Sequence, residues 1–322
     1  MAEAILEVSD LYVDYVSGAG TARAVDDVNI ALAPGEFLAI VGESGCGKST
    51  LLFAIAQLLS SPAELTGGSV IFKGKNLVQL TERDLKSLRW TEFSVVMQSA
   101  MNALNPMKSV GAQFTDAMRA HGVTEKAKIA DRSREVLALV GIDAIHLKSY
   151  PHQLSGGMRQ RVMIAMALLF SPELILMDEP TSALDVVAQR SLMVKVKELQ
   201  ERLGFAVIFV THDMSLVNTF SDRLAVMYAG MIVELGRTGE MFKDPLHPYT
   251  QGLVDAFPSI YGPRLPIEGI PGSPPDLSDP PAGCRFHPRC PKVMSICSER
   301  EPELYSVNGE HVRCFLYEVA RE

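Results

Sequence analysis

Short, mainly apolar segments alternate with helix-like segments through the first three quarters of the chain. Three apolar segments have the length and composition of buried strands, and they lie at 36–41, 174–177 and 206–210. Continuous apolar strands that are separated by helices are typical of a parallel sheet covered on both faces. The pattern therefore predicts an α/β fold with a mainly parallel sheet.

The pattern changes twice along the chain. Between about 85 and 165 it becomes largely helical, which indicates a helical subdomain. After about 240, prolines become frequent, and this segment holds 13 of the 19 prolines in the sequence. Proline interrupts helices and central strands, so the last segment is expected to be mostly neither. We therefore predict a core at 1–240 that includes the helical subdomain, and a C-terminal extension at 241–322.

Composition narrows the class of protein. The 322 residues are 47% hydrophobic and 21% charged, which is typical of a globular protein. A net charge of −8 argues against nucleic acid as the main partner. The longest apolar runs, 51–59 and 162–170, are far shorter than the ~20 residues of a membrane-spanning helix, and the start lacks the features of a signal peptide. We therefore expect a cytoplasmic protein unless other chains hold it at a membrane.

A glycine-rich loop follows the first of the predicted strands. Its sequence is Gly42-Glu43-Ser44-Gly45-Cys46-Gly47-Lys48-Ser49-Thr50, and a helix-compatible segment at 51–59 comes next. This is the G-x-x-x-x-G-K-[ST] pattern in the strand–loop–helix context that it requires. Backbone N–H groups and the helix N-terminus would bind phosphate, Lys48 would neutralise β- and γ-phosphate charge, and the Ser49 hydroxyl would bind Mg²⁺. The loop therefore predicts a nucleoside triphosphate site.

Cys46 lies inside this loop. The simplest interpretation is a small side chain that the loop tolerates. A thiol near a helix N-terminus could also have a lowered pKa, which would make the site sensitive to oxidation.

Two carboxylates end the strand predicted at 174–177, in the order Asp178-Glu179-Pro180. Asp178 would reach Mg²⁺ directly or through water, and Glu179 would orient or deprotonate the attacking water. His212 follows the strand predicted at 206–210, at the same carboxyl edge of a parallel sheet, where ligands of such sheets bind. We interpret it as a γ-phosphate contact; the alternative is a structural histidine.

The segment Leu154-Ser155-Gly156-Gly157-Met158-Arg159-Gln160-Arg161 precedes a helix-like segment and resembles the signature motif of ABC ATPases. Ser155, Gly156 and Gly157 would expose N–H groups at a helix N-terminus, which makes a second anion site. In that family, this site meets the nucleotide of the other subunit in a head-to-tail dimer. The resemblance implies that hydrolysis requires a partner ATPase.

Further elements of residues 1–240 resemble the same family. Tyr15 resembles the aromatic residue that stacks on adenine, although a core aromatic on a strand is the alternative. Gln98 resembles the Q-loop glutamine that touches Mg²⁺ or the lytic water, and Ser182 and Asp185 resemble the ends of the D-loop. The full prediction is Lys48, Gln98, Glu179 and His212 for catalysis; Tyr15, Gly42, Ser44, Gly45, Cys46, Gly47, Lys48, Ser49, Thr50 and Asp178 for nucleotide binding; and Ser49, Gln98 and Asp178 for Mg²⁺.

Finer features resemble the ATPases of dipeptide and oligopeptide importers. They are Asn102-Ala103-Leu104-Asn105-Pro106, the extended signature to Ala167, and His247-Pro248-Tyr249-Thr250. The resemblance implies a second ATPase, usually a paralogous chain, together with two permeases, an extracytoplasmic solute-binding protein, and a place on the cytoplasmic face of the membrane. Oligosaccharide or nickel import is an alternative cargo. A soluble ABC ATPase of repair or translation is a rival, disfavoured by the single phosphate loop and the lack of a long heptad region.

Four cysteines lie in the extension, and in a reducing compartment such a group more often binds metal than forms disulfides. The extension resembles that of peptide-importer ATPases with a 4Fe-4S cluster, and four thiolates are the usual complement of such a cluster. Zinc is an alternative, although the short C-x2-C to C-x4-C pairs of structural zinc sites are absent. Four free thiols are the third possibility. The predicted ligands are Cys284, Cys290, Cys297 and Cys314.

Overall fold

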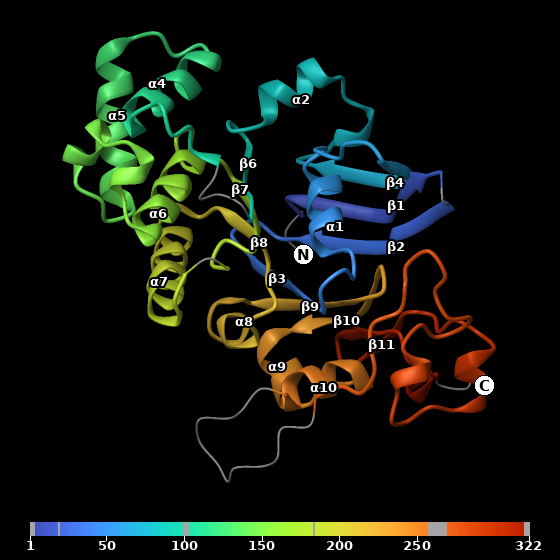
Figure 1. The fold of residues 1–322 in the computed structure, drawn as a ribbon. Coiled ribbons are helices and arrows are strands. Elements are labelled where there is room, and N and C mark those ends of the chain that lie inside the picture. Colours follow the sequence, from blue (N-terminus) through green and yellow to red (C-terminus); the bar gives the residue numbers. More distant parts are fainter. Residues whose placement is uncertain (1–3, 19, 99–102, 183, 257–268, 319–322) are drawn as a thin grey trace. The chain divides into compact units, whose positions relative to one another are not determined.

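The computed structural model describes residues 4–18, 20–98, 103–182, 184–256 and 269–318, and it forms two compact units (Figure 1). The first unit contains Met1–Ala33, Phe37–Val78 and Val210–Glu322, and the second contains Pro34–Glu36 and Gln79–Phe209. The first unit therefore joins the two ends of the chain.

An antiparallel sheet in the first unit comes from the N-terminal part of the chain. Its strand order is β2-β1-β4-β5, and all of its neighbours are antiparallel. Buried and exposed residues alternate along much of β1, and Leu6 lies opposite both Leu32 and Phe72. Such alternation is typical of a sheet with one face on the core. The strands are β1 (Leu6–Ser17), β2 (Gly20–Leu32), β4 (Ala63–Phe72) and β5 (Lys75–Asn76).

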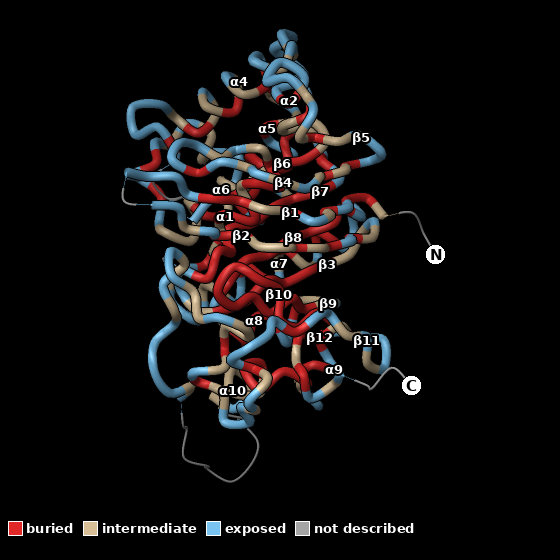
Figure 2. Tube along the Cα trace, turned by 90° about the vertical axis from the view of Figure 1, so that its right-hand side faces the viewer, coloured by how far each residue is buried: buried red, intermediate tan, exposed pale blue. Residues whose placement is uncertain are grey.

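The second sheet of the first unit has the strand order β11-β12-β10-β9-β3. β3 and β9 are parallel, and the remaining neighbours are antiparallel. Every residue of β3 is buried, and Figure 2 shows β3, β9 and β10 in the buried colour. The strands are β3 (Phe37–Val41), β9 (Arg223–Tyr228), β10 (Met231–Arg237), β11 (Tyr305–Val307) and β12 (Glu310–Val312). The helices are α1 (Lys48–Ile55), α8 (Met214–Phe220), α9 (Thr238–Lys243) and α10 (Pro248–Asp255).

The second unit contains the parallel pair β6 and β7, with β8 next to β7. Its strands are β6 (Phe93–Val96), β7 (Leu174–Asp178) and most of β8 (Ala206–Val210). Side-chain oxygens at the N-caps accept backbone N–H groups in α2, α4, α6 and α7, which explains where these helices begin. The helices are α2 (Glu82–Leu88), α4 (Val110–Ala120), α5 (Lys126–Leu139), α6 (Gly156–Ala167) and α7 (Val186–Leu203).

The remaining short elements are 3-10 turns. They are Leu77–Gln79, Ala144–Lys148, Pro151–Gln153, His287–Arg289, Ser295–Ser298 and Phe315–Tyr317. Three of the six lie in the proline-rich extension, where long helices were not expected. No helix within the described ranges is long and apolar enough to cross a membrane.

An aromatic cluster anchors the extension to the second sheet of the first unit. The ring of Phe286 is buried and lies 5.2 Å from the ring of Tyr228 and 5.3 Å from that of Tyr249, measured between centroids. His247 lies 5.7 Å from Phe286, and burial lowers its pKa to about 3, so it is neutral at physiological pH. Full burial of one such aromatic side chain stabilises a fold by roughly 1.5–3 kcal/mol.

The three strands predicted from apolar segments are present as β3, β7 and β8, which confirms the predicted α/β class with parallel pairing. The structure adds the antiparallel sheet and the antiparallel strands β10, β12 and β11. Residue Asn102, part of one predicted motif, and Ala183, inside the D-loop segment, lie outside the described residues.

Candidate functional site

The predicted phosphate loop connects β3 to α1, and its glycines are required by its geometry. Gly42 and Gly47 have φ angles of 153° and 106°. A Cβ atom on Gly42 would lie 2.1 Å from the carbonyl oxygen of Met227, and one on Gly47 would lie 2.1 Å from that of Ala24. Only glycine fits such close backbone approaches. The loop is therefore built as a tight turn that ends at the N-terminus of α1.

The side chain of Lys48 is fixed across this loop. It is buried, and its Nζ donates to the carbonyl oxygens of Gly42 at 2.8 Å and Glu43 at 2.9 Å. Ser44 and Gly45 are exposed at the turn, and Ser49 is partly buried at the start of α1. An ammonium, a hydroxyl and a helix N-terminus at one turn form a site suited to phosphate.

Cys46 is 3% exposed beside Lys48. Burial raises the pKa of its thiol, and this outweighs the opposing effect of the nearby ammonium. The suggestion of a lowered pKa at this helix N-terminus is therefore wrong, because desolvation disfavours the thiolate. The simpler interpretation, a small side chain that the loop accommodates, agrees with its burial.

Tyr15 and Thr50 lie together in the first unit. The hydroxyl of Tyr15 is 3.1 Å from Oγ1 of Thr50, and 36% of Tyr15 is exposed. The exposed fraction leaves a ring face available, unlike the fully buried core tyrosines. Its role in stacking on adenine stays a prediction.

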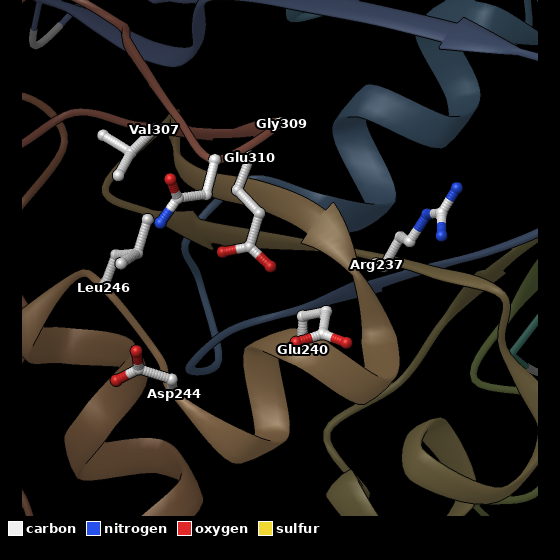
Figure 3. Close-up of a pocket in the computed structure, with 8 residues that line it drawn as sticks. Arg237, Glu240, Asp244, Leu246, Val307, Gly309 and Glu310 are labelled. Carbon is white, nitrogen blue, oxygen red and sulfur yellow. The ribbon is translucent and has the colours of Figure 1, made fainter.

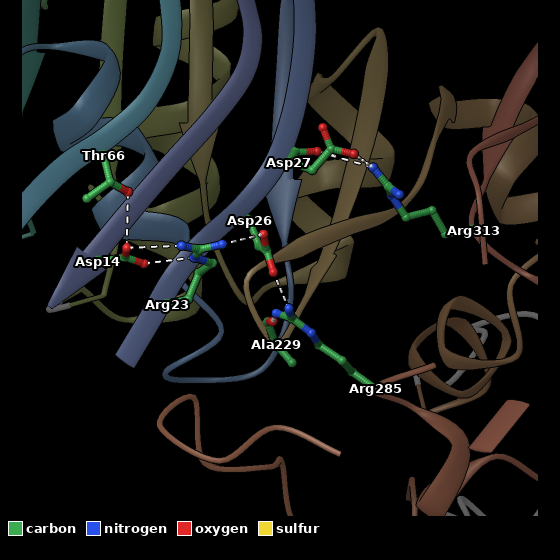
Figure 4. Close-up of polar contacts among 8 residues, drawn as sticks. All are labelled: Asp14, Arg23, Asp26, Asp27, Thr66, Ala229, Arg285 and Arg313. Atoms are coloured by element: carbon green, nitrogen blue, oxygen red, sulfur yellow. Dashed lines mark hydrogen bonds and ion pairs between the residues drawn. The ribbon is translucent and has the colours of Figure 1, made fainter. Parts of the chain in front are cut away.

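A chain of ionic contacts joins the strand of Tyr15 to the extension (Figure 4). Asp14 accepts from Nε of Arg23 at 2.9 Å and from Thr66 at 3.1 Å, and the bond to Arg23 lowers the pKa of Asp14. Arg23 also pairs with Asp26 at 3.7 Å. Arg285 of the extension pairs with the same Asp26 and with the carbonyl oxygen of Ala229, while Arg313 pairs with Asp27. The extension thereby contacts β2, far away in sequence.

The second unit contains the predicted acidic strand end. Asp178 is the last residue of β7 and is 2% exposed. Glu179 has a φ of 41°, which is unusual for a residue with a side chain. Nε2 of Gln98 donates to Oε2 of Glu179 at 2.9 Å. Gln98 and Glu179 are 81 positions apart in the sequence, and both are predicted catalytic residues. The structure brings their side chains together.

The predicted signature segment begins α6 in the second unit. Ser155 is the N-cap, and its Oγ accepts from the backbone N–H of Met158 at 3.3 Å. Gly156 and Gly157 are the first two helical residues, and a Cβ on Gly157 would meet nothing within 4 Å. The N-terminus of this 12-residue helix is therefore accessible on its own unit.

The structure also describes both ends of the predicted D-loop, Ser182 and Asp185, and the predicted γ-phosphate contact His212. Ser182 donates through its Oγ to the carbonyl oxygen of Glu179 at 3.1 Å, and Asp185 caps α7 by accepting from Ala188 at 2.9 Å. His212 is exposed directly after β8. The loop, Tyr15, Thr50 and His212 thus belong to the first unit, and Gln98, Asp178, Glu179, the signature and the D-loop belong to the second.

Oxygen donors suited to Mg²⁺ are present in both sets. A serine hydroxyl, an amide oxygen and a buried carboxylate are the hard ligands that Mg²⁺ prefers, so Ser49, Gln98 and Asp178 fit the predicted ion chemically. When bound, the ion would offset negative charge on the phosphates.

The described residues of the extension give no support to the predicted metal centre. The backbone N–H of Cys284 donates to the carbonyl oxygen of Cys297 at 2.8 Å, and all five cysteines are free. Burial raises the pKa of Cys284 to about 11 and also raises the pKa values of Cys290 and Cys314. Among the described residues, no three His, Cys, Asp or Glu side chains are grouped so that they could hold a metal ion. Neither the 4Fe-4S cluster nor zinc is supported by this arrangement.

Two residues from outside the loop, Tyr249 and Arg289, support it without having been predicted to do so. The N–H of Glu43 donates to the hydroxyl of Tyr249 at 2.9 Å, and the carboxylate of Glu43 pairs with Arg289. A hollow of about 430 Å³ is lined by loop residues Glu43–Cys46, by Tyr228 and Ala229, and by residues 274–277 of the extension. The one signal in the sequence was Tyr249, which was noted only as part of a family motif.

A second hollow, of about 450 Å³, lies between α9, the end of β10 and the β11–β12 turn (Figure 3). The carboxylates of Glu240, Asp244 and Glu310 surround it. Burial, and then the charge of Glu234, Glu240 and Asp244, raise the pKa of Glu310 to about 7. Oε1 of Glu310 is buried and has no hydrogen-bond partner among the described residues, so this carboxylate is poorly stabilised in its charged form.

Comparisons with known proteins place this arrangement in context. Residues 25–182 match the family model described as ABC transporter, and residues 233–297 match the one described as oligopeptide/dipeptide transporter, C-terminal region. The dipeptide transport ATP-binding protein DppD of Caldanaerobacter subterraneus is 42% identical over 98% of both chains. The oligopeptide transport ATP-binding protein OppD of Salmonella typhimurium is 43% identical over 98% of this chain and 94% of its own.

A solved structure is also similar. The ATP-binding cassette MJ0796, in a dimeric post-hydrolysis state bound to ADP and Pi, has a TM-score of 0.65 and 29% identity. The match covers 72% of this chain and 98% of that one. The similarity therefore covers almost the whole of that cassette.

Proposed function

We propose, from the premise that this chain belongs to the ATP-hydrolysing subunits of dipeptide and oligopeptide ABC transporters, that it powers peptide import by closing around ATP with a second ATPase. The observation that carries the proposal is the phosphate loop, with Lys48 fixed across the turn that begins α1. Relatives of nearly equal length support the cargo class through their names.

The roles follow from the chemistry of each side chain. Lys48 and the N–H groups of the loop bind the phosphates of ATP, and Tyr15 stacks on the base. Ser49, Gln98 and Asp178 would hold Mg²⁺. Glu179 orients the attacking water and accepts its proton, and the bond from Gln98 holds the Glu179 carboxylate in place.

The signature is proposed to act on the partner. Ser155, Gly156 and Gly157 present a helix N-terminus that would contact the γ-phosphate bound by the second ATPase. The D-loop residues Ser182 and Asp185 would cross the same dimer interface, and His212 would contact the γ-phosphate. Because each ATP then needs groups from both subunits, hydrolysis requires a dimer.

The wider assembly is proposed on the same basis. It comprises a second, paralogous ATPase, two permeases and an extracytoplasmic solute-binding protein, with this chain at the cytoplasmic face of the membrane. The ATPase core at 1–240 and the extension at 241–322 would be its two functional parts. Oligosaccharide or nickel import remains the alternative cargo.

Two substitutions test the catalytic assignment in the assembled transporter. Lys48→Ala should abolish ATP binding, because the loop loses its only ammonium. Glu179→Gln should bind ATP normally and lose most turnover, by a factor of roughly 100 or more, because the amide cannot accept a proton. ATP binding is measured with a non-hydrolysable ATP analogue, and turnover is measured as the rate of phosphate release.

Either of two results would overturn these roles. Normal turnover in the Glu179→Gln transporter would show that Glu179 is not catalytic. Normal ATP binding in Lys48→Ala would show that the loop does not bind the nucleotide.

Purification from native membranes tests the assembly. Permeases and a binding protein should accompany the chain, whereas accompanying nucleic-acid enzymes would favour a soluble ABC ATPase.

The cysteine cluster stays a prediction with its own measurement. Iron and labile sulfide are counted in protein purified without oxygen. About four of each per chain would establish the 4Fe-4S cluster that the resemblance implies. Zinc alone, or no metal, would reject the cluster.

A further inference from the structure

We propose that Arg289, in the proline- and cysteine-rich extension, is a positioning residue of the nucleotide site. It holds the phosphate loop through Glu43, so the extension sets the affinity of the loop for ATP. This inference rests on the proposed nucleotide site at residues 42–50 and adds a residue from outside the ATPase motifs.

The contact between Arg289 and Glu43 is bidentate, and its guanidinium is shielded from water. Nη1 of Arg289 lies 2.6 Å from Oε2 of Glu43, and Nη2 lies 3.0 Å from Oε1. The side chain of Arg289 is 5% exposed and that of Glu43 is 26% exposed. Bidentate pairs of this kind are stronger and more directional than ordinary hydrogen bonds, whereas exposed pairs contribute little. The pair is therefore able to fix the orientation of Glu43.

Arg289 is itself held from several sides. Its Nε donates to the carbonyl oxygen of Pro271 at 2.7 Å, and its guanidinium lies 5.8 Å from the ring centroid of Tyr228. The bond to Glu43 is the main cause that raises the pKa of Arg289, so the guanidinium stays charged at any physiological pH. A guanidinium fixed in this way gives the loop a rigid support instead of a mobile surface partner.

Glu43 connects this support to the phosphate-binding lysine. Its carboxylate pairs with Arg289, its N–H donates to the hydroxyl of Tyr249, and its carbonyl oxygen accepts from Nζ of Lys48. One residue is therefore fixed at its side chain and at both backbone polar groups. Release of the side chain would loosen the peptide group that orients the ammonium of Lys48.

Charge gives a second reason for the pair. Glu43 is the only acidic residue of the loop at 42–50, and an unpaired carboxylate there would repel the phosphates of ATP. Arg289 neutralises that charge. The sequence of the loop alone would place a carboxylate beside a polyphosphate, and the extension supplies the compensating cation.

Two other arginines keep the extension attached without Arg289. Arg285 pairs with Asp26 and Arg313 pairs with Asp27, both on β2 (Figure 4). The buried ring of Phe286 adds an apolar anchor. A variant at Arg289 should therefore keep the extension in place, so its effect on nucleotide affinity can be measured in a folded chain.

The test is ATP binding by the full chain with Mg²⁺, measured by calorimetry on five variants. They are Arg289→Gln, Arg289→Lys, Glu43→Gln, the Glu43→Gln/Arg289→Gln double variant, and Arg300→Gln. Arg300 is the matched control, because it lies in the same extension, pairs with Glu318, and is 59% exposed. Thermal unfolding of every variant reports on the fold.

We expect Arg289→Gln to weaken ATP binding by roughly tenfold, a size typical of coupling between two sites. Arg289→Lys should lie between this variant and the wild type, because it keeps the charge and loses the bidentate geometry. Arg300→Gln should bind as the wild type does. In the Glu43→Gln background, Arg289→Gln should cause little further loss, because the carboxylate through which it acts is gone.

Coupling is reciprocal, which gives a readout besides affinity. Binding of ATP should slow backbone hydrogen exchange in residues 284–297 of the wild type. The same slowing should be absent in Arg289→Gln at saturating ATP. A residue that merely stabilised the fold would not abolish this response.

Wild-type affinity in a folded Arg289→Gln chain would overturn the proposal. An equal loss with and without Glu43 would also overturn it, since Arg289 would then act by another route. If Arg289→Gln fails to fold, Arg289→Lys in both backgrounds decides the same question. Failure of the nucleotide site itself appears separately, as wild-type protein that does not bind ATP or a Lys48→Ala variant that still does.

Discussion

The phosphate loop and the signature segment are both glycine-containing helix N-termini, yet they are built in opposite ways. Gly42 and Gly47 lie against backbone carbonyls and cannot accept a Cβ, whereas Gly157 faces open space. Lys48 is buried and fixed by two carbonyl oxygens, while Ser155 is exposed at its helix cap. The comparison teaches that the loop is completed within its own unit, while the signature is left accessible on its unit.

The largest expected effect comes from adding a methyl group to each glycine. Gly47→Ala should lower the free energy of unfolding by about 3 kcal/mol and abolish ATP binding, because its φ is positive and its Cβ would meet Ala24. Gly157→Ala should change stability by no more than about 0.5 kcal/mol and leave ATP binding intact. Denaturant unfolding and calorimetry measure both.

The contrast between the two glycines would fail in one clear case. If Gly157→Ala unfolded the protein as strongly as Gly47→Ala, the signature segment would be as tightly built as the loop. A fall in hydrolysis with unchanged binding in Gly157→Ala would sharpen the assignment of this segment to the partner's nucleotide.

A smaller effect separates the structural role of Ser155 from its proposed functional role. Ser109 caps α4 with the same geometry, since both hydroxyls accept a backbone N–H at 3.3 Å. Ser109→Ala and Ser155→Ala should each lower stability by about 1 kcal/mol, the usual effect of losing an N-cap. Only Ser155→Ala should also lower the turnover of the assembled ATPase dimer.

Turnover relative to the wild type, at a temperature where both variants are folded, makes the distinction. Equal turnover in the two variants would mean that Ser155 is a helix cap and nothing more. The comparison of loop and signature would then have to rest on Gly156 and Gly157 alone.

The smallest effect concerns two buried carboxylates at the edge of the first unit. Glu234 accepts backbone N–H groups from Leu246 and His247, whereas Oε1 of Glu310 has no hydrogen-bond partner in the described part of the chain. The pKa of Glu310 is raised to about 7 from an ordinary value of 4.5, so the folded state holds this proton more tightly than the unfolded state. Its contribution to stability is therefore fully present below pH 4.5 and is lost as pH rises toward 7.

Glu310→Gln should consequently be more stable than the wild type at pH 8, and this advantage should shrink toward pH 4.5. Glu234→Gln should be less stable at pH 8, because the amide keeps one acceptor oxygen and its nitrogen cannot accept the second N–H group. Melting temperatures at pH 5 and pH 8 measure the difference. A Glu310→Gln chain that is destabilised at pH 8 would show that the carboxylate has a favourable charged state.

Much of the candidate site was predictable because its signals are local. The strands β3, β7 and β8, which were predicted from apolar segments, are each only five residues long, and the glycines of the loop lie within six residues of chain, from Gly42 to Gly47. The N-cap serines and aspartates are equally local, since each cap interacts with residues three positions away. Patterns of this kind involve only neighbouring residues, so they can be recognised before the tertiary fold is known.

Other features could not be predicted in the same way. The raised pKa of Cys46 could not be predicted, because proximity to a helix N-terminus is visible in the sequence and burial is not. The antiparallel strands β10, β11 and β12 were missed because two of them are three residues long. Four clustered cysteines and a family resemblance predicted a metal centre, yet no three His, Cys, Asp or Glu side chains of the described residues are grouped so that they could hold an ion.

The sequence by itself determined the class of fold, the phosphate loop and the family, because each depends on residues close together in the chain. Only the tertiary structure decided that Gln98 bonds to Glu179 and that Arg289 of the extension pairs with Glu43, 246 positions away. Pairing across such separations leaves no periodic trace in a single sequence. For Arg289 it arises because folding buries the guanidinium, and a buried charge must find its counter-ion wherever the chain happens to bring one.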